Sequence, residues 1–249
     1  MLDACLDLLL GSSCAVCARP GRVLCRDCAD GLPSAGRVCW PTPRPVGLAL
    51  PVSAGEYDGA LKALVNAHKE RRQFALARPL GTVLAHVVRD LTVLEAGAGR
   101  PVLLVPVPSR AVVVRSRGHD PMLRTTRRAA DQLRRWGIDA TVVGVLRSRT
   151  VVRDQSGLQA VDRARNLAGS MQAAGTRLQQ TLRRRPGAHL VITDDVLTTG
   201  STAREAQRAL EDAGATVAGI ATVAATRKRL ASTSTGESPS SLPFSGSGD

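Results

Sequence analysis

The sequence predicts an α/β protein with a parallel sheet flanked by helices and a small N-terminal cysteine-rich domain. Short apolar segments alternate with amphipathic helical segments between residues 102 and 224, and all six cysteines lie in the first 45 residues. This alternation favours a parallel sheet, because parallel strands need crossover connections and the crossover helices cover both faces. With 43% hydrophobic residues, the chain can bury a core, which excludes a fully disordered protein.

The expected elements follow from the spacing of apolar residues. Helices are expected over residues 60–65, 80–94, 121–136 and 202–213, and strands over 102–105, 141–146, 190–192 and 216–224. In the helix 121–136, the expected inward side chains are Met122, Thr126, Ala129, Leu133 and Trp136. The expected outward side chains are Arg124, Arg127, Arg128, Arg134 and Arg135. Composition divides the chain into a cysteine-rich domain at 10–45, the main domain at 52–229 and a disordered Ser/Gly/Pro-rich tail at 231–249.

The net charge of the 249-residue chain is +13, and only three of its 34 basic residues are lysines. Such a charge suggests a polyanionic partner, either a nucleic acid or a phosphorylated metabolite, although an arginine-rich composition alone would also produce it. The chain has only two Trp, one Tyr and two Phe, which argues against a protein that grips bases mainly by stacking. No apolar run approaches the ~18 residues of a membrane span, and the acidic start does not resemble a secretory signal. We therefore expect a cytoplasmic protein.

The cysteines form two Cys-x-x-Cys pairs, Cys14 with Cys17 and Cys25 with Cys28. Two such pairs can supply the four thiolates that structural zinc takes in a tetrahedron. A disulfide pair or incidental cysteines are the alternatives, and a chain that stays inside the cell disfavours disulfides. Because all four ligand positions would be filled, we expect one structural zinc. Cys5 and Cys39 lie outside the pairs, and small apolar roles are expected for both.

The most informative stretch is LVITDDVLTTGSTARE, residues 190–205. An apolar strand leads into Asp194 and Asp195, followed by the Thr/Gly/Ser segment 198–202 and then a helix. A loop that opens a helix presents backbone N–H groups and hydroxyls to phosphate, and open α/β sheets bind ligands at this edge. Two adjacent carboxylates suit the paired hydroxyls of a sugar. The combination predicts a ribose 5-phosphate site, whereas a simple N-capped helix would explain only single residues.

This segment resembles the phosphoribosyl pyrophosphate (PRPP) signature of type I phosphoribosyltransferases. The wider chain, residues 10 to 226, resembles the ComF family, which joins an N-terminal zinc knuckle to that fold. The family pattern is matched in order by the four paired cysteines, Lys69, the PVPS loop at 106–109, Arg117-Gly118, Gln155, Asp162-Arg163, Asn166 and the 194–202 segment. The sequence departs from the pattern at His119, Asp120 and Asp162, and its second cysteine pair is reduced to Cys39.

The resemblance implies that PRPP binds together with Mg²⁺. The 5-phosphate would lie on Thr198, Thr199, Gly200, Ser201 and Thr202. The catalytic pair Asp194 and Asp195 would hold the ribose hydroxyls and stabilise positive charge on the ring. Pyrophosphate would contact Pro106, Val107, Pro108, Ser109, Arg117 and Lys69, and residues 148–166 would form a lid.

The acceptor has no visible signal, so three functions stay open. The protein is a phosphoribosyltransferase with an unknown acceptor, a non-catalytic PRPP sensor, or a competence factor associated with single-stranded DNA. The resemblance implies a role in DNA uptake, with single-stranded DNA or DNA-uptake proteins as further partners. The arginine face of the helix 121–136 would suit such phosphates.

Overall fold

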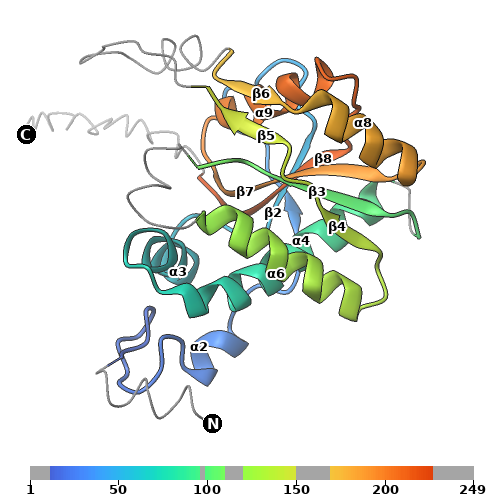
Figure 1. The fold of residues 1–249 in the computed structure, drawn as a ribbon. Coiled ribbons are helices and arrows are strands. Elements are labelled where there is room, and N and C mark those ends of the chain that lie inside the picture. Colours follow the sequence, from blue (N-terminus) through green and yellow to red (C-terminus); the bar gives the residue numbers. More distant parts are fainter. Residues whose placement is uncertain (1–11, 96–98, 110–119, 150–168, 227–249) are drawn as a thin grey trace, which may run out of the picture.

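The computed structural model describes residues 12–95, 99–109, 120–149 and 169–226. A six-stranded sheet with the order β1-β2-β8-β7-β3-β4 forms the centre of this part of the chain (Figure 1). The parallel strands are β2 (Leu50–Ser53), β8 (Gly219–Ala225), β7 (His189–Leu197), β3 (Val102–Pro106) and β4 (Ala140–Val142). The short strand β1 (Arg37–Val38) pairs antiparallel with β2. The predicted class, a mostly parallel sheet flanked by helices, is confirmed.

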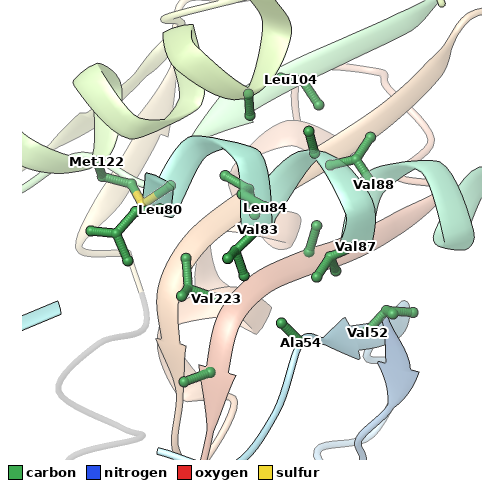
Figure 2. Packing of buried hydrophobic residues seen from close by; sticks show 14 of the residues in the cluster. Val52, Ala54, Leu80, Val83, Leu84, Val87, Val88, Leu104, Met122 and Val223 are labelled. Carbon is green, nitrogen blue, oxygen red and sulfur yellow. The ribbon is translucent and has the colours of Figure 1, made fainter. Parts of the chain in front are cut away.

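One face of the sheet is covered by α3 (Gly59–Glu70), α4 (Ala77–Leu94) and α6 (Pro121–Arg135), with the short 3₁₀ helix η1 (Phe74–Leu76) leading into α4. Figure 2 shows Leu80, Leu84 and Val88 of α4 within this core, together with Leu104 and Val223 from the sheet. These side chains are almost fully buried. The spacing of three and four residues that predicted the helix therefore produces its buried face.

The opposite face is covered by α8 (Gly175–Arg184), α9 (Ser201–Glu211) and a separate antiparallel pair, β5 (Leu146–Ser148) and β6 (Met171–Ala173). Successive residues of β3 divide between the two cores: Leu104 belongs to the first, and Leu103 and Val105 belong to the second. Both faces are apolar because the strand is covered on both sides, which explains why it reads as a continuous apolar run.

Two predictions about local structure are wrong. Residues 141–146 do not form one strand: β4 ends at Val142, and β5 begins at Leu146 in the other sheet. Gly144 lies between them, and glycine weakens a strand interior. Trp136 does not point inward: it follows the last residue of α6, is 36% exposed and stacks at a tilt on His86. Met122, Thr126, Ala129 and Leu133 are buried as expected, and the five arginines expected to point outward from α6 are exposed.

The cysteine-rich segment contains the short helix α2 (Arg26–Asp30) and an isolated bridge between Ser13 and Pro20. It continues directly into β1 at the edge of the main sheet, and Cys39 N donates to Pro51 O at 3.0 Å just beyond the strand. The predicted disordered tail and Cys5 lie outside the described residues.

Candidate functional site

The candidate site lies where β7 ends and α9 begins. Strand β7 is longer than the apolar run that predicted it, so Asp194 and Asp195 belong to the strand and residues 198–200 form the connection to α9. Gly200 has φ +74°, in the left-handed region that favours glycine. A Cβ at Gly200 would lie 3.0 Å from Pro41 Cγ, so the tight turn also needs the absence of a side chain.

The connection presents polar groups at the start of an 11-residue helix. Thr198 and Thr199 are exposed, and the hydroxyls of Thr199 and Ser201 lie 2.9 Å apart. The backbone N–H of Ser201 points toward Thr199 Oγ1 at 3.4 Å. Because the first N–H groups of a helix lack intrahelical partners and the helix dipole is positive there, this arrangement can bind an anion such as phosphate.

The two carboxylates have different partners. Asp195 Oδ2 accepts a hydrogen bond from Lys69 Nζ at 2.7 Å, and Asp194 Oδ1 accepts one from the backbone N–H of Asp195 at 2.9 Å. Burial, together with the negative charge of Asp195, raises the pKa of Asp194 to about 8. Burial lowers the pKa of Lys69, but the attraction of Asp195 outweighs it and leaves that pKa above its usual value. Within the described residues, Lys69 therefore pairs with the charge of Asp195, while Asp194 holds its proton more tightly than a free carboxyl group does.

The PVPS loop reaches the same edge of the sheet, because β3 is the parallel neighbour of β7. Val107 N donates to Thr193 O at 2.9 Å just beyond the last paired residue of β3. Ser109 Oγ lies 3.4 Å from Asp120 Oδ1, and Asp120 caps α6 by accepting from the N–H groups of Met122 and Leu123. This cap was not predicted, although an Asp directly before a proline at the first helical position is a recognisable helix start.

Several predicted site residues lie outside the described residues, so their positions are not discussed. They are Arg117, His119, Gln155, Asp162, Arg163 and Asn166, with most of the predicted lid. The described part of the site therefore comprises Lys69, residues 106–109 and residues 194–202. These three segments come from α3, the end of β3 and the β7–α9 connection.

The four paired cysteines form a second candidate site. The sulfur atoms of Cys14, Cys17, Cys25 and Cys28 all lie within 4.8 Å of one another, and the Cys17 and Cys25 sulfurs are 3.6 Å apart. Thiolates about 2.3 Å from a central zinc would lie about 3.8 Å from each other in a tetrahedron. The cluster thus has the ligand set and spacing to hold a metal ion such as zinc.

The thiols of this cluster differ in how readily they ionise. Burial opposes ionisation of Cys14, but backbone N–H groups, first that of Cys25 at 3.5 Å, lower its thiol pKa to about 6. Hydrogen bonding to Cys25 and burial raise the pKa of Cys28 to about 12. The Cys14 thiol therefore ionises more readily than the Cys28 thiol.

Together, the fold and the strand–loop–helix site define a phosphoribosyltransferase-type protein. A family model described as the phosphoribosyl transferase domain matches residues 88–237, more than half of the chain. The chain therefore belongs to the phosphoribosyl transferase domain family. A search among curated proteins finds no match. Within the described ranges, no helix combines the length and apolar character needed to cross a membrane.

Proposed function

We propose that the protein binds PRPP with Mg²⁺ at residues 194–202 and transfers the phosphoribosyl group to an acceptor. The observation that carries the proposal is the combination of paired carboxylates on β7, a polar helix-opening loop and the lysine at 2.7 Å from Asp195. Phosphate, sugar hydroxyls and pyrophosphate are the three parts of PRPP, and each finds a suitable group in this arrangement.

In the proposed complex, the 5-phosphate accepts from the N–H and hydroxyl groups of residues 198–202. The ribose hydroxyls take the place of Lys69 on Asp195. Lys69 Nζ, released from that ion pair, turns to the pyrophosphate oxygens beside Ser109 and the rest of the PVPS loop. Because Asp195 and Lys69 are only partly buried, at 25% and 39% side-chain exposure, this exchange needs no rearrangement of the core.

Magnesium, when bound with PRPP, would neutralise pyrophosphate charge. Mg²⁺ prefers oxygen ligands and keeps several waters, so the protein need supply few donors. The carboxylates of Asp194 and Asp195 and the Ser109 hydroxyl are oxygen donors at this edge of the sheet. During transfer, the acceptor atom forms a bond to ribose C1 while the C1–O bond breaks and its electron pair leaves on pyrophosphate. The acceptor's proton passes to pyrophosphate or water, and the Asp195 carboxylate offsets positive charge on the ring.

The decisive experiment is calorimetric titration with PRPP in the presence of Mg²⁺. The variant Asp194→Asn/Asp195→Asn should lose binding while its circular dichroism spectrum stays unchanged. Asp30→Asn, an exposed substitution in α2, is the matched control and should bind like the wild type. Equal affinity of the double variant and the wild type would overturn the site assignment. Release of pyrophosphate across a panel of bases and amines then separates a transferase from a PRPP sensor.

Membership of the ComF family and a role in DNA uptake belong to this proposal. The four-cysteine cluster before the phosphoribosyl transferase domain supports the family assignment. The exposed arginines of α6 favour single-stranded DNA as a second candidate ligand, although Arg128 and Arg134 both pair with Asp131. Salt-sensitive DNA binding that weakens in Arg127→Ala/Arg135→Ala but persists in Asp195→Asn would support DNA binding. Binding that does not depend on salt, or no binding at all, would exclude DNA binding through the arginines of α6.

A further inference from the structure

A groove lies between α8 and strand β4, away from the proposed PRPP site. Its volume is about 880 Å³, and Thr141 and Val142, both half-buried, lie in its lining. Pro101, Asp139 and Pro186, which shortly precede β3, β4 and β7, line it as well. The groove therefore reaches the amino ends of these strands, whereas the proposed PRPP site lies at the carboxyl ends of β3 and β7.

One wall of the groove is β4, the last strand of the described six-stranded sheet. Asp139 O accepts from the first residue of β3 at 2.7 Å, and Val143 N donates to β3 at 2.8 Å. Because backbone groups alternate along a strand, those of Ala140 and Val142 point away from β3. The carbonyl of Ala140 accepts from Arg134 Nη1 at 2.8 Å. The N–H and C=O of Val142 therefore remain at the edge, where an extended peptide can pair with them.

The opposite wall is one face of α8, and it is basic. Four polar residues line the groove at helical intervals of three and four: Arg177, Gln180, Thr181 and Arg184. Both of these arginines are exposed. Asp139 is the one acidic residue among the described residues of the lining, and it pairs with Arg185 just beyond α8. The wall therefore presents positive charge to a ligand.

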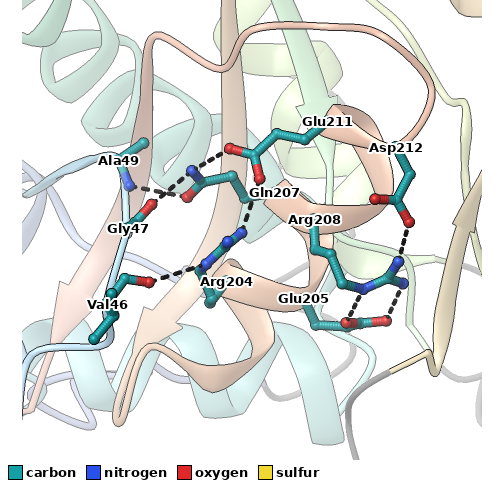
Figure 3. Close-up of polar contacts among 9 residues, drawn as sticks. All are labelled: Val46, Gly47, Ala49, Arg204, Glu205, Gln207, Arg208, Glu211 and Asp212. Carbon is teal, nitrogen blue, oxygen red and sulfur yellow. Dashed lines mark hydrogen bonds and ion pairs between the residues drawn. The ribbon is translucent and has the colours of Figure 1, made fainter.

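The two groove arginines differ from the arginines of α9. Figure 3 shows that Arg204 and Arg208 pair with carboxylates of their own helix and its end. Within the described ranges, no carboxylate is close enough to form such a pair with Arg177 or Arg184. The charge of the groove arginines is therefore available to an acidic partner.

These features favour an extended acidic peptide over a nucleic acid. A peptide main chain supplies both the acceptor and the donor that match Val142, whereas a DNA backbone carries acceptors only. The described lining contains no aromatic residue on which bases could stack. Arg177 and Arg184 are about 10 Å apart along the helix axis. Alternate residues of a strand are about 7 Å apart on one face, so two glutamates on that face can reach both arginines.

We propose that the groove is a docking site for an extended acidic segment of a partner protein. The segment adds as a strand to β4, and its acidic side chains contact Arg177 and Arg184. Main-chain hydrogen bonds to Val142 fix the segment along the edge, and the two charges select acidic sequences. Docking leaves the carboxyl ends of β3 and β7 free, so it goes beyond the proposed transferase function and does not depend on it.

Fluorescence anisotropy of the full-length protein tests the contribution of charge. The probe is a fluorescein-labelled peptide of alternating glutamate and threonine, about ten residues long, which spans β4 and its flanks. The wild type should bind it saturably, and Arg177→Gln/Arg184→Gln should bind it at least about tenfold more weakly. Arg183→Gln is the matched control, because Arg183 is an exposed neighbour in α8 that does not line the groove. This control should bind like the wild type.

A second pair of variants tests the main-chain pairing. Val142→Pro removes the N–H at the open edge, and Val142→Thr keeps it. Proline is tolerated on an edge strand where the N–H points away from the sheet, so both variants should give the circular dichroism spectrum of the wild type. Val142→Pro should bind the peptide at least about fivefold more weakly, and Val142→Thr should bind it normally.

A peptide of alternating glutamate and proline keeps the charge but loses half of the main-chain donors. It should bind the wild type at least about tenfold more weakly, and this comparison holds even if Val142→Pro fails to fold. Docking by strand addition is wrong if the two peptides bind equally, if the glutamate/threonine peptide does not bind, or if the double arginine variant binds it like the wild type.

A single-stranded oligothymidylate of the same length distinguishes the other class of ligand. Tighter binding of this oligonucleotide than of the acidic peptide, lost in Arg177→Gln/Arg184→Gln, would overturn the proposal in favour of a DNA site. In calorimetry, the double arginine variant should bind PRPP like the wild type. Failure of peptide docking and failure of the proposed function therefore appear in different assays.

Discussion

Replacing Asp194 with Asn is expected to stabilise the fold at pH 8. Burial and the adjacent Asp195 raise the pKa of Asp194 from 3.8 to about 8 in the folded protein. A raised folded-state pKa means that the native state holds the proton more tightly than the unfolded chain. The resulting stability is fully present below about pH 4 and is lost as the pH rises to about 8. Asparagine keeps the shape of the side chain without this loss.

The expected gain in the free energy of unfolding follows from the ordinary and the folded-state pKa of Asp194. A difference of about four pH units, at about 1.4 kcal/mol per unit, sets a ceiling of about 5–6 kcal/mol at pH 8 and above. By surface area the Asp194 residue is only half-buried, so nearby solvent screens its charge. We therefore expect a measured gain of about 1–2 kcal/mol for Asp194→Asn at pH 8.

Urea unfolding at pH 5 and pH 8 is the appropriate assay. With a denaturant slope of about 2 kcal/mol/M, the midpoint of Asp194→Asn should rise by about 0.5–1 M at pH 8 and by clearly less at pH 5. The urea midpoint of the exposed control Asp30→Asn should change equally little at both pH values. The reasoning would be refuted if Asp194→Asn were less stable than the wild type at pH 8. It would also be refuted if the variant gained the same stability at pH 5 and at pH 8.

Three further predictions concern metal binding, the tight turn and the core. Freshly purified protein should contain one zinc per chain, and Cys25→Ser should lose it; metal analysis that finds no zinc contradicts the knuckle. Gly200→Ala should cost about 1–3 kcal/mol in urea unfolding, because its φ is +74° and Pro41 blocks the new Cβ, whereas Gly144→Ala, with open space around it, should be nearly neutral. Leu84→Ala, at a fully buried position, should lower the free energy of unfolding by about 2–5 kcal/mol. The half-exposed Leu94→Ala should lower it much less. Similar urea midpoints for the two variants would disprove the assigned core.

The elements that could be predicted from the sequence are those buried on a wide apolar face. Strand β3 and helix α4 carry clear apolar patterns because both lie in the centre of the fold. Helix α8 was missed because Leu178 is its only fully buried residue, so its sequence shows no apolar stripe. The short strands β5 and β6 owe their existence to pairing with each other, and three-residue segments carry no period of their own.

The candidate site was predictable in its composition but not in its contacts. Asp195 and Lys69 were both named from the sequence, yet they are 126 residues apart, and only the packing of α3 beside the sheet brings them together. A small cavity lined by Trp40, Leu197, Thr198 and Ala225 was not foreseen at all. It arises where the segment around Trp40 crosses the ends of β7 and β8, and no local pattern encodes such a crossing.

The alternation of side chains along β7 gives the two carboxylates different tasks under the proposed function. Thr193 bonds to Thr126 of α6 and Asp195 bonds to Lys69 of α3, so residues two apart both meet helices on the same face of the sheet. Asp194 lies between them in sequence, and its raised pKa keeps it protonated at neutral pH. When the environments of two adjacent carboxyl groups differ in this way, one is protonated and can donate a hydrogen bond, and the other is ionised and can accept one. We expect Asp195, whose lysine partner can be exchanged, to accept from a ribose hydroxyl, and Asp194 to donate to a ribose oxygen. PRPP affinity should therefore fall as the pH rises through about 8, and calorimetry that finds constant affinity across that range would contradict this division.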